Sequence, residues 1–151
     1  MSEANIEFLK EELVGLSLAA KHLEYSLERC AELIGQSDLP PEKLERLESL
    51  TSRFARLADL LIQRIFRLID EIELVGMGTV RDRIERADKR GWANASQLVK
   101  IRELRNMIAH EYAAEKMVEI YSVVYALATE LLAIVPKVSK DAHVLINKYS
   151  R

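Results

Sequence analysis

The sequence predicts a single all-α domain over residues 1–151, and three observations lead to this prediction. Only 5 residues are Gly and 3 are Pro, so few positions would interrupt a helix. Hydrophobic residues make up 49% of the chain and charged residues 30%, which suits amphipathic helices around a core. Apolar side chains also recur every three or four positions. We therefore expect an up-and-down bundle of four main helices plus a short helix.

The first two helices are expected to be long. The apolar spacing predicts a helix over about residues 5–34, ended by Gly35. Residues 35–41 are dense in helix breakers, and Pro41 suits the first position of a helix. The second helix should therefore cover about residues 42–75 and stop at the glycines of residues 76–78.

Shorter elements follow in the second half of the chain. Thr79 and Asp82 have the spacing of a capping box, which predicts a short helix ended by Gly91. Trp92 comes next and is expected to be buried in the turn. A fourth helix should begin at Asn94 or Ser96 and carry residues 105–112. The fifth is expected over about residues 114–135, ended by Pro136 and followed by a short last helix.

Composition excludes several classes of function. Lys and Arg total 22 against 24 Asp and Glu, and this net charge of −2 argues against specific binding of duplex DNA. Cys30 is the only cysteine and the three histidines are scattered, so we expect neither a metal site nor a cofactor. The N-terminal segment has no basic leader pattern, and the longest apolar stretch, residues 123–135, is too short to span a bilayer. These features predict a cytoplasmic protein that does not bind membranes.

The most informative segment is residues 105–112, with the sequence RNMIAHEY. Arg105 is suited to binding a phosphate through two hydrogen bonds, and His110 to proton transfer near neutral pH. Asn106 and Tyr112 add an amide and a phenol within about two helical turns. Because this helix also carries apolar core positions, the cluster of polar groups points to chemistry on a phosphate. A lone histidine after an apolar turn more often belongs to a core or a cap, and that explanation stays open.

Helix geometry limits how these residues could act together. Arg105 and Tyr112 project about 20° apart on a regular helix, whereas Arg105 and His110 are about 140° apart. Either the helix is distorted near Ala109, or the site is composite and needs a second copy of the chain. We favour a homodimer that brings two such segments together across a cleft.

The segment resembles the Arg-x4-His-x-Tyr motif of HEPN-domain proteins, specifically the HepT-like toxins of HEPN/MNT toxin–antitoxin pairs. The resemblance implies a HEPN-like domain and a dimeric, metal-independent endoribonuclease. Arg105 would then hold the scissile phosphate, and His110 would transfer a proton as the 2′-hydroxyl attacks. Asn106 would give polar support. It also implies a nucleotidyltransferase antitoxin that neutralises the toxin by transferring AMP to Tyr112.

Two other hypotheses compete with the ribonuclease. The chain could be a non-catalytic subunit that binds substrate for, or regulates, a nucleotidyltransferase. It could also be a helical-bundle interaction protein in which the motif is a coincidence.

Arginines of the expected second helix form a stripe within an arc of about 80°. These are Arg46, Arg53, Arg56, Arg64 and Arg67. They could be a solvated face paired with acids at helical spacing, or a track for an RNA backbone. The candidate RNA contacts are Arg53, Arg56, Arg64 and Arg67 together with Arg102 of the motif helix. A second basic cluster, Arg81, Arg83, Arg86, Lys89 and Arg90, precedes that helix.

Overall fold

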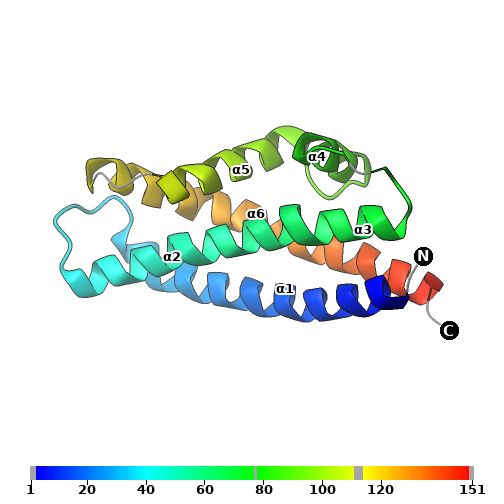
Figure 1. Cartoon of the computed structure of the whole chain (residues 1–151). Coiled ribbons are helices and arrows are strands. Elements are labelled where there is room, and N and C mark those ends of the chain that lie inside the picture. Colours follow the sequence, from blue (N-terminus) through cyan, green and yellow to red (C-terminus); the bar gives the residue numbers. More distant parts are fainter. Residues whose placement is uncertain (1–2, 77, 111–113, 150–151) are drawn as a thin grey trace.

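Helices make up almost the whole of the described chain. The computed structural model describes residues 3–76, 78–110 and 114–149, and no strand occurs within these ranges. Figure 1 shows α1, α2 with α3, α5 and α6 running roughly along one another, with α4 at one end. The predicted all-α class is therefore confirmed.

The end of the first helical segment near Gly35 and the start of the second at Pro41 lie where the sequence predicts a loop. Helix α1 (Glu3–Cys30) continues into a 3-10 turn, η1 (Ala31–Leu33), and Gly35 then adopts a φ of 84° that favours glycine. Helix α2 (Pro41–Asp59) begins with Pro41 in its first turn, as predicted. The α-helical part of the first segment ends earlier than expected, because its last turn tightens to 3-10 geometry.

The second long helix is not regular. A π-helical segment, η2 (Leu60–Ile65), separates α2 from α3 (Phe66–Ile72). The Phe66 N–H donates to the Leu61 carbonyl five residues earlier, instead of four as in an α-helix. We expected one uninterrupted pattern over residues 42–75. The apolar spacing does not reveal this extra residue in the turn.

The short helix α4 (Val80–Lys89) and its turn confirm three expectations. Thr79 and Asp82 form the complete capping box. Gly91 has a φ of 80°, and Trp92 is 2% exposed. The Trp92 indole N–H donates to Asp141 Oδ2 at 2.7 Å, which ties the turn to the last helix.

Helix α5 (Ala95–His110) starts after Asn94, whose carbonyl accepts the Leu98 N–H at 3.1 Å. Of the two predicted cap residues, Asn94 is therefore the one that precedes the helix. The Asp88 carboxylate accepts the Ala95 N–H at 2.8 Å, so the start of α5 is joined to α4.

The last helix differs most from expectation. Helix α6 (Ala114–Tyr149) runs through Pro136 instead of ending there. Pro136 is exposed, so water can solvate the carbonyl that its missing N–H leaves unpaired, while Ile134 and Val138 are buried on the opposite face. Packing of that apolar face keeps the helix continuous.

One consequence concerns membranes. Over Lys116–Tyr149, α6 is long and apolar enough to cross a bilayer, a test that the core helix of a soluble protein also passes. The length argument against a span therefore does not hold for α6.

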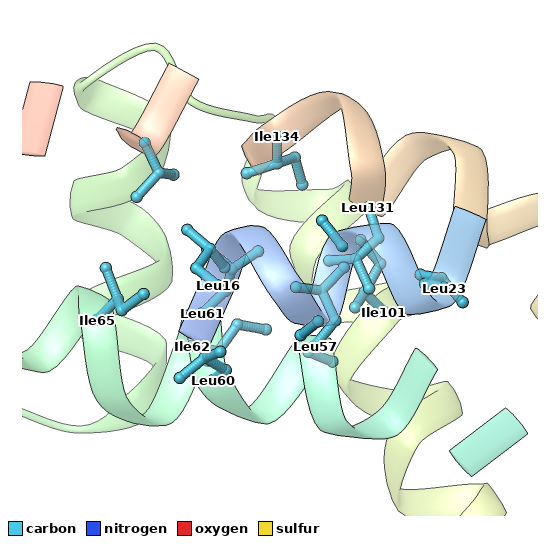
Figure 2. Close-up of a cluster of buried hydrophobic side chains, with 14 of the residues drawn as sticks. Leu16, Leu23, Leu57, Leu60, Leu61, Ile62, Ile65, Ile101, Leu131 and Ile134 are labelled. Carbon is cyan, nitrogen blue, oxygen red and sulfur yellow. The ribbon is translucent and has the colours of Figure 1, made fainter. Parts of the chain in front are cut away.

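A continuous hydrophobic core joins the long helices. Helix α1 packs against α2 and α6, and α5 packs against α2, α4 and α6. Figure 2 shows part of this core, with labelled side chains from α1, α2, η2, α5 and α6. The labelled side chains are Leu16, Leu23, Leu57, Leu60, Leu61, Ile62, Ile65, Ile101, Leu131 and Ile134. The π-helical segment is thus anchored on its inner side by four buried residues, Leu60, Leu61, Ile62 and Ile65.

Candidate functional site

A groove with a volume of about 880 Å³ contains part of the motif. Arg102, Arg105 and Asn106 line it from α5. Arg56 lines it from α2 and Arg64 from η2. Glu11, Glu12 and Asp59 lie along the same groove, so four arginines are interleaved with three acids. This mixture suits a ligand with repeated negative charges that can compete with carboxylates for the guanidinium groups.

Arg105 makes the best-defined polar contact in this groove. Its Nε donates to Asp59 Oδ1 at 2.7 Å and its Nη2 donates to Asp59 Oδ2 at 2.9 Å. This bidentate hydrogen bond raises the pKa of Arg105, which is cationic in any case. A guanidinium has five N–H donors, so three remain for a ligand. The Asp59 and Arg105 side chains are 41% and 34% exposed, so the pair is accessible from the groove.

The π-helical segment decides which arginines reach the groove. On a regular helix Arg53 and Arg64 would project about 20° apart and Arg56 and Arg64 about 80° apart. Residues in a π-helical turn advance by less than 100° each, so η2, which contains Arg64, turns this side chain away from the direction of Arg53 and toward that of Arg56. Arg56 and Arg64 do line the groove, whereas Arg53 does not. Segments of this kind often occur at functional sites.

Arg56, Arg64 and Arg102 are the candidate RNA contacts that share the groove with Arg105. Arg56 and Arg102 are exposed. Arg64 is 64% exposed and lies 3.4 Å from a carboxylate oxygen of Glu12, whose side chain is only 11% exposed. All three guanidinium groups can therefore be reached by a ligand in the groove.

The two other candidates, Arg53 and Arg67, lie elsewhere. Arg53 Nη1 donates to the His22 carbonyl at 3.1 Å and to Ser26 Oγ at 2.8 Å, so it joins α2 to α1. Arg67 pairs with Glu71 at 3.3 Å, one turn further along its own helix. The stripe seen in the sequence is therefore divided among separate surfaces.

Part of the second basic cluster is structural. Asp70 is 4% exposed and lies 2.8 Å from Arg86 and 2.9 Å from Arg90, which holds α4 against α3. Arg90 also lies over the Trp92 ring, 5.0 Å from its centroid. These two arginines are occupied by packing and pairing within the bundle.

The position of His110 after an apolar turn predicts a place at the rim of the core, but His110 is the last residue of α5 and is exposed. It does not line the groove that holds Arg105 and Asn106. The apolar spacing of Leu98, Ile101, Leu104 and Ile108 predicts the core side of this helix, and this is confirmed, because the first three are buried and Ile108, which is partly buried, packs against the core. Tyr112 falls outside the described residues.

Sequence reasoning missed the roles of Asp59 and Glu12. Helical spacing predicts that Asp59 pairs with arginines of its own helix, but it pairs with Arg105, 46 residues away. The partner role of Glu12 could have been found from the sequence, because Glu12 is an acid at the edge of the apolar stripe of its helix and such an acid needs a cation. Within the described part of the chain, no group of three His, Cys, Asp or Glu side chains could hold a metal ion.

The resemblance to HEPN-domain proteins is carried only by the identity and spacing of Arg105, His110 and Tyr112. No family model, no curated protein and no solved structure matches the chain.

Proposed function

We propose that the protein is a metal-independent endoribonuclease of the HepT-like HEPN class. One observation carries the proposal: Arg105 and Asn106 of the motif open onto the groove that also presents Arg56, Arg64 and Arg102. Arginines that converge from α2, η2 and α5 suit the successive phosphates of a single-stranded RNA. The net charge of −2 is compatible with this site because the basic groups are local.

In the proposed reaction the RNA supplies its own nucleophile. Arg105 holds the scissile phosphate and stabilises the charge that develops on its oxygens. His110 transfers a proton, either by removing it from the 2′-hydroxyl or by donating it to the leaving 5′-oxygen. The 2′-oxygen forms a bond to phosphorus as the bond to the 5′-oxygen breaks, which leaves a cyclic phosphate. DNA lacks the nucleophile and is not cleaved.

The active unit in this proposal is a homodimer. The groove contains Arg105 but not His110, and the two project about 140° apart on α5. His110 is exposed at the end of its helix, where it is accessible to a second copy of the chain. A two-chain site would combine Arg105 of one copy with His110 of the other.

Regulation in this proposal acts on Tyr112. A cytoplasmic nucleotidyltransferase antitoxin transfers AMP to the phenol oxygen, and the added phosphate competes for the arginines of the groove. The modification would thereby block binding of RNA.

A second candidate function is a non-catalytic subunit that binds substrate for a nucleotidyltransferase. The bidentate contact between Asp59 and Arg105 favours it, because it occupies two N–H groups of the arginine that should hold the phosphate. Three N–H groups of Arg105 nevertheless remain available.

The test is cleavage of a defined RNA in EDTA by wild-type protein, Arg105→Ala and His110→Ala. The proposal expects cleavage by the wild type only, and no cleavage of DNA of the same sequence. His143→Ala is the matched control, because His143 is also an exposed helical histidine but lies on α6, outside the motif of α5.

The cleavage assay must use protein that carries no AMP on Tyr112, which is established by measuring the masses of its peptides. If such protein is inactive, the ribonuclease proposal is wrong. Formation of a complex with a nucleotidyltransferase would then support the binding subunit.

A further inference from the structure

We propose that Asp59 is a positioning residue, which orients Arg105 for the phosphate at the expense of affinity for RNA. This inference rests on the proposed function, since it assigns a role to a residue of the same groove. Asp59 comes from α2, directly before the π-helical segment.

Both side chains project from anchored backbone. Asp59 lies between Ala58 and Leu60, which are 1% and 9% exposed. Leu104, beside Arg105, is 4% exposed. Neither helix can shift at this point without disturbing the core. The carboxylate therefore holds the guanidinium plane in one orientation through the contacts of 2.7 and 2.9 Å.

This arrangement leaves a defined edge of Arg105 free. The Nε–H and one N–H of Nη2 donate to Asp59, and among the described residues no hydrogen bond takes the two N–H groups of Nη1 or the other N–H of Nη2. A preoriented donor set stabilises a transition state better than a mobile side chain, because it needs no reorganisation during the reaction.

The carboxylate of Asp59 also weakens the binding of RNA to the groove before the reaction. Asp59 adds a negative charge to a groove that already contains Glu11 and Glu12. Phosphates entering the groove are repelled by it and compete with it for Arg105. Removing the charge should therefore tighten binding while slowing the chemical step. If Asp59 only supported the fold, its substitution would lower both the affinity for RNA and the rate of the chemical step.

Asp59→Asn tests this, because it keeps the shape of the side chain and removes its charge. Binding is measured with a 2′-O-methyl RNA, which cannot be cleaved, and cleavage with the unmodified RNA of the same sequence. We expect the dissociation constant to fall about 3- to 10-fold, with a steeper dependence on salt. We expect kcat to fall about 10- to 100-fold.

Glu42→Gln is the matched control. Glu42 is a 77% exposed carboxylate paired with Arg46 at 3.0 Å, and it lies outside the groove. Its loss should change neither binding nor kcat. If Asp59→Asn leaves both quantities unchanged, or lowers affinity and kcat together, the positioning role is wrong.

Failure of the proposed function can be distinguished from failure of this inference. If unmodified wild-type protein cleaves no RNA, the ribonuclease proposal fails. The orientation of Arg105 is then judged by the NMR signal of its Nε–H. A slowly exchanging signal that Asp59→Asn abolishes and Glu42→Gln retains supports the positioning role. A signal that exchanges equally fast in all three proteins overturns it.

Discussion

The buried carboxylate of Asp70 gives the sharpest prediction about stability. Asp70→Ala removes the partner of Arg86 at 2.8 Å and of Arg90 at 2.9 Å, whose side chains are 22% and 19% exposed. Arg86 Nε donates a hydrogen bond to Asp70 Oδ2 at 3.0 Å, and a hydrogen bond to a charged group contributes about 1.5 kcal/mol at the lower end of its range. Together with the loss of the ion pair to Arg90, we expect a loss of about 3 kcal/mol, which is the lower end of the range for breaking a buried pair. Arg90 keeps Glu73 at 3.1 Å and its contact with Trp92, so a larger loss is not expected.

Urea unfolding followed by circular dichroism measures this loss directly. For a protein of this size about 3 kcal/mol corresponds to a fall in Tm of about 6–12 °C. Glu71→Ala is the matched control, because it breaks the more exposed pair with Arg67 and should cost less than about 1 kcal/mol. If Asp70→Ala lowers the free energy of unfolding by no more than the control, the assignment of Arg86 and Arg90 to structure is wrong.

Three further predictions concern other parts of the fold. Pro136→Ala should raise the free energy of unfolding by about 1–3 kcal/mol, because it restores an N–H inside α6; a lower urea midpoint would contradict this. Hydrogen bonds from Thr79 lower the pKa of Asp82, so its contribution to stability is complete above its ordinary pKa and is lost as pH falls through the lowered value. The urea midpoint of the wild type should therefore fall more steeply than that of Asp82→Asn below about pH 4. Burial raises the pKa of the Cys30 thiol, which is 0% exposed, so a thiol reagent should label it quickly only in urea; rapid labelling of the native protein would refute this.

Local signals in the sequence predicted the elements whose causes are themselves local. The capping box of Thr79 and Asp82 needs only residues three apart, and it is present. Gly35 and Pro41 act through their own backbone angles. The apolar spacing likewise identified the core side of α5. In each case the physical cause lies within one turn of the chain.

Pro136 shows where such reasoning stops. A proline costs a helix about the same wherever it lies in the interior, so the sequence favours a break at residue 136. The structure continues because Ile134, Val138 and their neighbours on the buried face of α6 pack against the core. The sum of those contacts is a property of the whole bundle.

The candidate site divides in the same way. The sequence alone determined that Arg105, Asn106 and His110 lie on one helix, and that their angles prevent Arg105 and His110 from acting together on an undistorted helix. Only the tertiary structure decided that Asp59 holds Arg105. It also decided that Arg56 and Arg64 share the groove while Arg53 does not. The reason is physical: side-chain spacing is set within a helix, whereas pairing across helices and the extra residue of η2 depend on how the helices pack.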